Sequence, residues 1–578
     1  MCAKVVPLHS RVVSCRICQK MTISKSDNKE NEPVQNIPVA EPLINQVRSL
    51  FPQADENMIE LLVEQAKNVG RDPKGRRWSK KFVGVCLQMY NKSPNCYDLL
   101  YSSKLLVLPS KSLLILYKNL IKQQPGFDDD VFQWMYTEAN RQNIPEGERY
   151  GGIIFDEMSI QTDIQIDKHG DIVEISGFTD YGNEGDSCYA LKQGSNEKKV
   201  GKYALQLLFL GTNGFRFPFA YFITNGVQAS ELCGMFWKAV YLLRCAGFTA
   251  LYTCMDGAQA NRSFMHMCLG DKPHNYIARS PCSSNDIIFV MDFSHVVKKI
   301  RNNILKSGIH PKSTRILTLT SFFTIQWQMF TDFFNWDQQN ALQTHKKLSR
   351  EHFHLDSQLK MRNHLAEDVL NSEMLHSMKL YKNNLGEKGE VLNGVIELLE
   401  NTSKLIEIFR DMRPVKSLDD NRISTLHDVA TWFSAWDNFI LNCPEIPGKD
   451  RKKRLLSQQC SEDIQSCILG FTALCKTVLT KSSVMYVTPG LVNSDVIENI
   501  FNQQRSTYHG ANTNPSALQY QRAVNSILVG QNVVSKKSNA ANTKVKYEPY
   551  RLDIKEPLRK RPTSSSSSTC SEIKVKKL

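Results

Sequence analysis

Residues 151–158 read GGIIFDEM, an apolar run rich in β-branched residues that ends at Asp156. A second apolar run, LYTCM at 251–255, stops directly before Asp256. Such runs predict buried strands, and the strand ends of an α/β sheet are where active sites gather. A third acid, Glu498, lies in DVIENIF at 495–501, whose periodicity predicts an amphipathic helix. These three acids are the first candidates for a functional site.

Further apolar runs separated by turn residues predict additional strands at 172–178, 205–210, 217–223 and 287–291. Between the fourth and fifth predicted strands, the pattern indicates a helix from Ser230 to Cys245 that ends before Gly247. Several strands in succession, followed by a strand after a helix, predict a mixed α/β sheet. From about 300 to 480 the strand signal fades and the chain reads as helical, with connectors at 412–420 and 443–453.

Two aspartates and one glutamate are a suitable donor set for two Mg²⁺ ions, because Mg²⁺ prefers hard oxygen ligands. Such a pair clamps the attacking and leaving oxygens in phosphoryl transfer. Each acid also has an ordinary structural interpretation. Asp156 ends a strand, Asp256-Gly257 is a common turn dipeptide, and Asp495 with Glu498 fits a capping box. From the residues alone, both interpretations stay open.

A small helical domain is predicted before the sheet, where apolar residues recur behind polar caps. Ser110 suits the N-cap of a helix that carries Lys111, with Lys118 and Lys122 further along. A helix-turn-helix reader of DNA has this pattern. A helical packing module with a solvated basic face fits it equally well.

The composition indicates a globular, intracellular protein. Of 578 residues, 41% are hydrophobic, and the formal charge of +14 favours polyanionic partners. Residues 531–578 contain twelve Lys or Arg against four Asp or Glu, so over half of the excess charge lies in this tail. The sixteen cysteines show no regular spacing, and no apolar run approaches the roughly 18 residues of a membrane span.

Several separated motifs resemble the P-element transposase family, including its THAP-type relatives. They are Leu108–Ser110, Gly151–Met158, Met255–Arg262, Asp292–Lys298 with Arg301-Asn302, and Asn493–Phe501 continuing through Arg505, Gly510 and Asn514-Pro515 to Gln519. Their order along residues 45–530 is more specific than any single motif. The N-terminal THAP zinc finger of that family is absent, and no sustained heptad stretch indicates a coiled coil.

The resemblance implies an RNase H-like core with a DDE triad made of Asp156, Asp256 and Glu498, which would ligate two Mg²⁺ ions. It also implies that the long segment between Asp256 and Glu498 contains a helical insertion that binds GTP. Lys298 is then the candidate for phosphate contact and Asp495 the candidate for contact with the base or its metal. The simpler interpretation is that Asp292, His295 and Lys298 form one polar face of an ordinary helix.

The predicted fold class is therefore α/β: an RNase H-like mixed sheet, interrupted by a large all-α insertion and preceded by a small helix-turn-helix-like domain. The expected segments are a disordered N-terminus at 1–43, the helical DNA-binding domain at 44–125, the first part of the core at 126–300, the insertion at 301–480, the last part of the core at 481–530 and a disordered basic tail at 531–578.

The predicted function is that of a DDE-type DNA transposase that cleaves and joins DNA strands. The alternative is a domesticated, catalytically inactive nuclear DNA-binding protein, and an RNase H-like exonuclease is disfavoured by the insertion and the helical head. We expect double-stranded DNA and a guanine nucleotide as partners, a homo-oligomer on DNA, no membrane and a nuclear location.

Overall fold

The computed structural model describes residues 43–118, 124–169, 172–184, 199–270, 276–282, 284–309, 313–481, 485–506 and 514–530. The chain divides into two compact units, with the boundary between Arg77 and Trp78. The predicted disordered N-terminus and basic tail, Lys122 and Gly510 lie outside the described residues.

The first unit contains a helical pair, α2 (Leu43–Leu50) and α3 (Glu56–Asn68), followed by the 3₁₀ turn η1 (Pro73–Gly75). Asp55 caps α3 by accepting a hydrogen bond from the backbone N of Met58 at 2.8 Å. Val47, Ile59 and Val63 form a small core between the two helices. Because this core is closed within the unit, the predicted domain at 44–125 is divided between two units.

Three further helices open the second unit: α4 (Lys80–Lys92), α5 (Pro94–Ser102) and α6 (Lys111–Lys118). A serine precedes each of them and caps it by accepting a hydrogen bond from a backbone N. This confirms the predicted cap at Ser110, whose hydroxyl accepts from the backbone N of Leu113 at 3.3 Å. Helix α4 packs against α20 (Ala517–Gly530), which comes from the far end of the chain.

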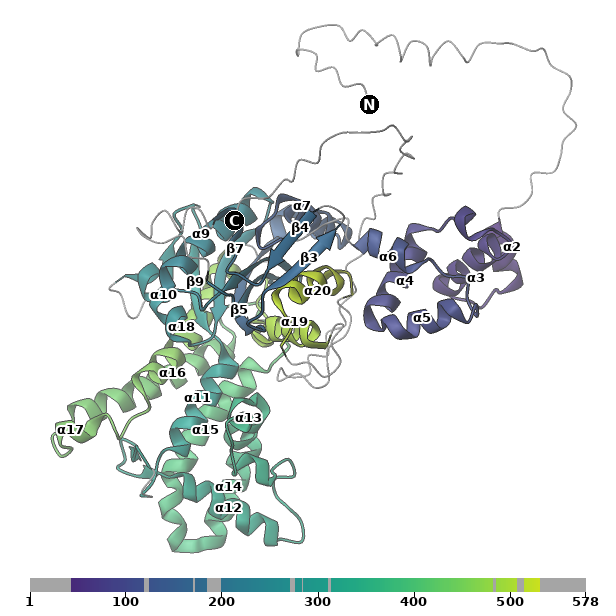
Figure 1. Ribbon diagram of the computed structural model, residues 1–578. Coiled ribbons are helices and arrows are strands. Elements are labelled where there is room, and N and C mark those ends of the chain that lie inside the picture. The colour runs from purple at the N-terminus through teal and green to yellow at the C-terminus, as the bar shows by residue number, and fades with distance from the viewer. Residues whose placement is uncertain are drawn as a thin grey trace, which may run out of the picture. The chain divides into compact units, whose positions relative to one another are not determined.

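The central sheet has seven strands in the order β1-β6-β5-β2-β7-β9-β8. Their bounds are β1 Gly126–Phe127, β2 Tyr150–Ser159, β5 Tyr203–Gly211, β6 Arg216–Thr224, β7 Thr249–Met255, β8 Ile277–Arg279 and β9 Asp286–Met291. Strands β2, β7 and β9 are parallel neighbours, whereas the other pairings in the sheet are antiparallel. Near-continuous apolar sequences form these strands because both faces of the sheet are covered (Figure 1).

An aromatic cluster fixes helices to one face of this sheet. Helices α9 (Ala229–Cys245) and α10 (Gln259–Leu269) contribute Phe236 and Phe264, whose ring centroids lie 5.1 Å apart. Both rings contact Phe155 of β2 and Phe289 of β9. Since adjacent residues of a strand point to opposite faces, Phe155 and Asp156 lie on different sides of the sheet.

The opposite face receives the end of the chain. Asp156 is directly across from Gln206 of β5, so both side chains lie on the same face. The hydroxyl of Tyr520 in α20 donates to the Gln206 Oε1 at 2.8 Å. Helix α19 (Asp495–Ser506) packs against β2. The helix that carries Glu498 therefore returns to the strand that carries Asp156.

A long helical segment separates β9 from α19 (Figure 1). Its helices are α11 Phe293–Leu305, α12 Trp327–Gln339, α13 Asn363–Leu370, α14 Ser372–Leu385, α15 Asn393–Phe409, α16 Asn421–Asn442, α17 Gly448–Arg451 and α18 Gln458–Lys481. The sequence pattern missed a short hairpin within it, β10 (Leu317–Thr318) with β11 (Thr324–Ile325), and the helix α17 inside a predicted connector. Both elements are too short to leave a periodic signal.

Smaller elements complete the fold. The hairpin of β3 (Gln165–His169) and β4 (Ile172–Ser176) follows β2 along the chain. Helix α7 (Asp129–Arg141) precedes β2. The remaining 3₁₀ turns are η2 Glu146–Glu148, η3 Gly182–Glu184, η4 Arg350–His352, η5 Leu359–Met361, η6 Gly386–Leu392 and η7 Pro489–Leu491. Within the described ranges, every helix is too short or too polar to cross a membrane.

Candidate active site

Asp156 and Asp256 occupy equivalent places in the register of two adjacent parallel strands. Asp256 directly follows β7, whereas Asp156 lies within β2, which continues to Ser159, so the interpretation that Asp156 ends a strand is wrong. Ile154 of β2 is paired with Cys254 of β7, and each aspartate comes two residues after its member of this pair. Glu498 lies in the first turn of α19, which packs against β2. All three side chains are half-buried.

The three carboxylates are close enough for their charges to interact. Burial raises the pKa of Asp156 well above its usual range, and the negative charges of Asp256 and Glu498 raise it further. This mutual repulsion shows that the structure brings the three predicted acids into one neighbourhood. Among the described residues, however, no three His, Cys, Asp or Glu side chains are arranged to hold a metal ion. Their role as metal ligands stays a prediction.

One oxygen of Asp256 is used by the turn that follows β7. Its Oδ1 accepts hydrogen bonds from the backbone N of Ala258 at 3.0 Å and from the Asn261 Nδ2 at 2.7 Å. The turn interpretation of Asp256-Gly257 is therefore correct for this oxygen. The other oxygen, Oδ2, lies 4.0 Å from the Nδ1 of His295.

Helix α11 adds a histidine and a lysine to the acidic neighbourhood. Lys298 is buried, and its Nζ lies 3.3 Å from the Nε2 of His295. Burial lowers the pKa of Lys298, while the charges of Asp292, Glu498, Asp256 and Asp156 oppose this change. The pKa of His295 is also lowered, first by burial and then by the charge of Lys298. The predicted phosphate-contact residue is thus a neighbour of the three acids.

Asp292 is the N-cap of α11 and joins this helix to α19. Its Oδ2 accepts from the backbone N of His295 at 3.0 Å, and its Oδ1 accepts from the backbone N of Ser494 at 2.9 Å. The sequence placed Asp292, His295 and Lys298 on one polar helix face. The contacts show in addition that Asp292 fixes the chain just before Asp495 and Glu498.

Asp495 is buried and is paired with a cation that the sequence did not indicate. The Nη1 of Arg410, next to the end of α15, donates to the Asp495 Oδ2 at 3.2 Å. Arg410 also binds Glu367 and donates to the Ser294 Oγ at 3.1 Å. Burial raises the pKa of Asp495 to about 6, although Arg410 acts in the opposite direction. The carboxylate is used by this ion pair rather than by a capping box.

The predicted DNA-binding lysines are only partly described. Lys111, at the start of α6, forms an ion pair with Asp98 of α5, and its side chain is 48% exposed. Lys118 ends α6, but its side chain and the whole of Lys122 lie outside the described residues. Their contact with DNA stays a prediction.

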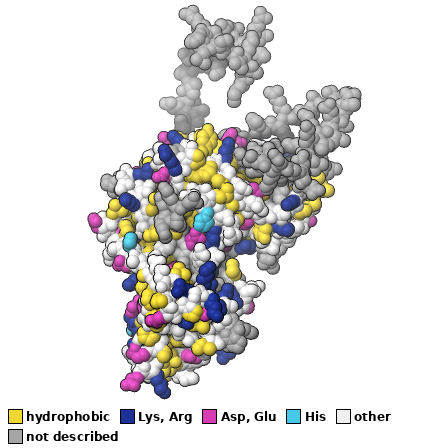
Figure 2. All heavy atoms as spheres, turned by 90° about the vertical axis from the view of Figure 1, so that its left-hand side faces the viewer, with side chains coloured by type: hydrophobic (Ala, Val, Ile, Leu, Met, Phe, Trp, Pro, Cys, Tyr) yellow, Lys and Arg dark blue, Asp and Glu magenta, His cyan; other side chains and the backbone are white. Residues whose placement is uncertain are grey.

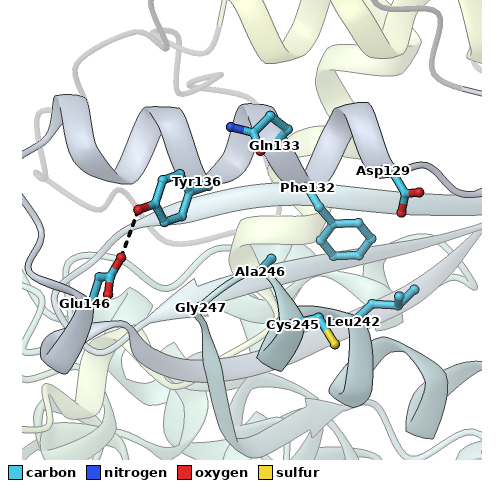
Figure 3. A pocket seen from close by; sticks show the side chains of 9 residues that line it. All are labelled: Asp129, Phe132, Gln133, Tyr136, Glu146, Leu242, Cys245, Ala246 and Gly247. Carbon is cyan, nitrogen blue, oxygen red and sulfur yellow. Dashed lines mark hydrogen bonds between the residues drawn. The ribbon is translucent and has the colours of Figure 1, made fainter. Parts of the chain in front are cut away.

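A surface pocket of about 430 Å³ lies between α7 and the end of α9 and contains none of the predicted site residues (Figure 3). Tyr136 donates a hydrogen bond to Glu146 across one end of it, at 2.9 Å. Phe132 and Leu242 give it apolar walls, and Asp129 and Glu146 make its rim acidic. It is a separate feature from the acidic neighbourhood.

Comparisons with known proteins agree with the motifs. Residues 123–269 match a family model described as "TNP-like, RNase H N-terminal domain". Human DNA transposase THAP9 is 24% identical over 231 residues, which make up 39% of this chain and 24% of the human protein. The match therefore spans about a quarter of that relative. A chain of the Drosophila P element transposase strand transfer complex superimposes with a TM-score of 0.64 at 17% identity, covering 85% of this chain and 98% of that chain.

The mixed sheet gives the chain an RNase H-like fold similar to that of the Drosophila P element transposase structure, as the predicted fold class stated. The three comparisons support a P-element transposase-like family. This confirms the resemblance drawn from the motifs.

Proposed function

We propose that this protein is a DDE-type DNA transposase, a metal-dependent enzyme that cleaves and joins DNA strands. The main support for this proposal is the interaction of Asp156 on β2 with the charges of Asp256, directly after the parallel strand β7, and of Glu498 on α19. Carboxylates that repel one another in a half-buried place are costly for the fold. A cation bound between them would offset this repulsion.

The donor set fits Mg²⁺, since all three groups supply hard oxygen ligands. Bound there, a pair of Mg²⁺ ions would supply activation of a hydroxyl and neutralisation of the leaving oxygen. The chain's own contribution is orientation. The amide of Asn261 and the backbone N of Ala258 hold one oxygen of Asp256 and leave the other oxygen for a ligand. Lys298 places an ammonium group beside the acids, where it can contact a phosphate of a bound nucleotide.

The decisive experiment compares Glu498→Gln with Asp428→Asn in the full chain. Asp428 is an exposed carboxylate on α16, so its replacement controls for the loss of one negative charge. We expect Glu498→Gln to abolish Mg²⁺-dependent cleavage and strand joining while leaving the fold and DNA binding nearly intact, because the amide keeps the shape but loses the charge. Asp428→Asn should behave as wild type. Unfolding of the Glu498→Gln protein would show that this carboxylate is structural.

We propose duplex DNA as the partner, bound through phosphate contacts. Lys and Arg side chains gather over the inserted helices on the face shown in Figure 2, and the sequence adds Lys111, Lys118 and Lys122 in or just after α6. Replacing these three lysines by Ala should weaken DNA binding. It should also reduce the slope of log affinity against log salt by about one for each lysine that neutralises a phosphate in the wild type. An unchanged slope would exclude these lysines from the interface.

A guanine nucleotide, a homo-oligomer on DNA and a nuclear location complete the proposal. Lys298 and Asp495 are the proposed nucleotide contacts, and the pairing of Asp495 with Arg410 sets a condition on this idea. A nucleotide base that binds Asp495 must share it with Arg410 or displace it. Calorimetric titration of GTP into wild type and Asp495→Ala tests the assignment, and equal affinities would refute it.

The second candidate is a domesticated, catalytically inactive DNA-binding protein. It is favoured by the absence, within the described residues, of three side chains arranged for a metal ion. If wild type binds DNA but cleaves none with Mg²⁺ or Mn²⁺, this candidate is the better one.

A further inference from the structure

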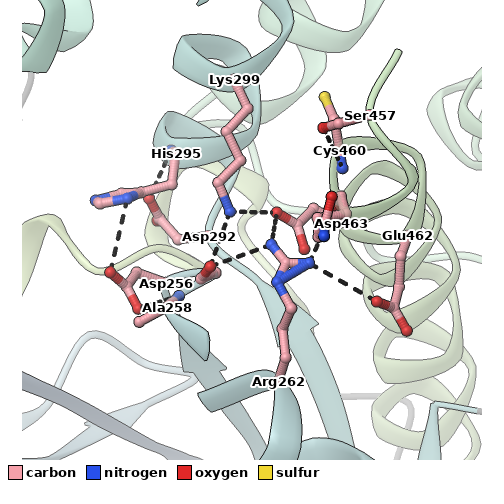
Figure 4. A network of polar contacts seen from close by, with 12 residues as sticks. Asp256, Ala258, Arg262, Asp292, His295, Lys299, Ser457, Cys460, Glu462 and Asp463 are labelled. Carbon is pink, nitrogen blue, oxygen red and sulfur yellow. Dashed lines mark hydrogen bonds and ion pairs between the residues drawn. The ribbon is translucent and has the colours of Figure 1, made fainter. Parts of the chain in front are cut away.

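Behind the turn that carries Asp256, three helices meet in a buried ion cluster (Figure 4). Its members are Arg262 of α10, Lys299 of α11 and Asp463 of α18. The Asp463 Oδ2 accepts from the Arg262 Nη2 at 2.6 Å and from the Lys299 Nζ at 2.5 Å. Asp463 is 1% exposed and Arg262 is 4% exposed. Charges buried to this degree interact strongly with one another.

Both cations of this cluster also hold the backbone next to Asp256. The Arg262 Nη2 and the Lys299 Nζ each donate to the carbonyl oxygen of Gly257 at 3.1 Å. A Cβ at position 257 would clash with the Lys299 Nζ and the Arg262 Nη2. Only glycine leaves room for this approach. The peptide that follows Asp256 is therefore anchored by contacts separate from those of the Asp256 carboxylate.

Asp463 joins the inserted helices to the core at this point. It lies on α18, the last helix before the chain returns to the sheet, whereas Arg262 follows the turn by only a few residues. Arg262 also donates to the carbonyl oxygen of Gln459 at 3.0 Å. A shift of α18 would therefore move the two cations that hold the Gly257 carbonyl.

We propose that Asp463 is a positioning residue for Asp256: through Arg262 and Lys299 it holds the Gly257 carbonyl and so fixes the direction of the Asp256 carboxylate. The inference rests on the proposed function, in which Asp256 is a metal ligand. Groups that orient metal ligands without touching the metal commonly change metal affinity 10–100-fold when they are replaced. Removing the Asp463 charge leaves the buried Arg262 and the partly buried Lys299 without their shared partner, and these cations then rearrange or admit water.

An ion cluster with a structural role alone would stabilise the fold without controlling the turn after Asp256. A variant of the neighbouring acid, Glu462, distinguishes this role from the positioning role. Glu462, also on α18, lies 3.7 Å from the Arg262 Nη1 and 2.9 Å from the His266 Nε2. It shares Arg262 with Asp463, but its second partner is His266 rather than Lys299. Glu462→Gln is therefore a matched control for Asp463→Asn.

The experiment measures hydrogen exchange in peptides spanning residues 255–262 of the full chain, together with Mn²⁺ affinity by calorimetry. For Asp463→Asn we expect exchange in this turn to be at least about tenfold faster and Mn²⁺ binding at least about tenfold weaker, with β5 protected as in wild type. Glu462→Gln should stay within about twofold of wild type in both measurements, because it leaves the contacts of Asp463 in place. Steady-state cleavage should show a lower kcat for Asp463→Asn with little change in KM for DNA.

The inference would be overturned if hydrogen exchange at residues 255–262 of Asp463→Asn were as slow as in wild type. It would also be overturned if Glu462→Gln accelerated this exchange as much as Asp463→Asn does. If Asp463→Asn does not fold, Lys299→Met decides, because methionine has no N–H to donate to the Gly257 carbonyl and the Arg262–Asp463 pair stays in place. The same tenfold loosening supports the inference, and unchanged exchange refutes it. Failure of wild type to bind Mn²⁺ would instead refute the proposed function, while the exchange measurement still decides whether Asp463 fixes the turn.

Discussion

Replacing Asp495 by Asn should stabilise the protein at neutral pH and leave its stability unchanged in acid. The carboxylate is 4% exposed, and burial raises its pKa from the usual 3.8 to about 6 even though Arg410 opposes the shift. This difference of about two pKa units corresponds to about 3 kcal/mol, at about 1.4 kcal/mol for each unit. Asn resembles the protonated acid in shape and lacks the charge that is costly to bury.

The direction of the pH dependence follows from which state holds the proton. Below about pH 3, Asp495 is protonated in both the folded and the unfolded chain and contributes no difference. Between about pH 4 and 6 the unfolded chain has released its proton while the folded chain retains it, so the free energy of unfolding falls as the pH rises. Above about pH 6 the penalty is complete and constant.

Urea unfolding of wild type and Asp495→Asn at pH 4, 5, 6 and 7 measures this contribution, with Asp428→Asn as the exposed control. The difference between Asp495→Asn and wild type should grow from about 0.5 kcal/mol at pH 4 to about 3 kcal/mol at pH 7, because the other carboxylates titrate alike in both proteins. A variant that is less stable than wild type at pH 7 would refute the reasoning. It would show that the ion pair with Arg410 outweighs the cost of burial.

Three more predictions concern the core and the tail. Phe236→Ala should lower the free energy of unfolding by about 3–5 kcal/mol, because it removes the ring at the centre of the aromatic cluster. Urea unfolding measures this loss, and a value below about 1 kcal/mol would contradict the central role of the ring. Gly470→Ala places a Cβ against the carbonyl oxygen of Phe289, so calorimetry should show a lower Tm, corresponding to about 1–3 kcal/mol; an unchanged Tm would mean that α18 moves freely on β9. Truncation after residue 530 removes a net charge of +8. It should reduce both the nuclear accumulation of a fluorescent fusion and the salt dependence of DNA binding. If the truncated protein behaves as wild type in both assays, the tail has no role in nuclear entry or DNA binding.

Local pattern was sufficient where each residue's surroundings are set by its near neighbours. The strands containing Ile154 and Cys254, the helix that ends at Cys245 and the cap at Ser110 were all predictable, because alternation, periodicity and capping act over a few residues. The motifs also selected the three acids that the fold brings into one neighbourhood. The division of the helical head after Arg77 was not predictable, since a small closed core leaves no signal at a boundary.

Local patterns in the sequence are enough to locate most strands and helices, their apolar faces, and two aspartates, Asp156 and Asp256, next to apolar strand residues. The partners of the charged groups depend on how distant segments pack: Arg410 for Asp495, His295 and Lys298 beside the acids, and Asp463 near Gly257. The difference comes from the separation along the chain over which each effect acts. Backbone preferences act between neighbours along the chain, whereas the cost of burying a charge depends on which distant segment supplies its counter-charge.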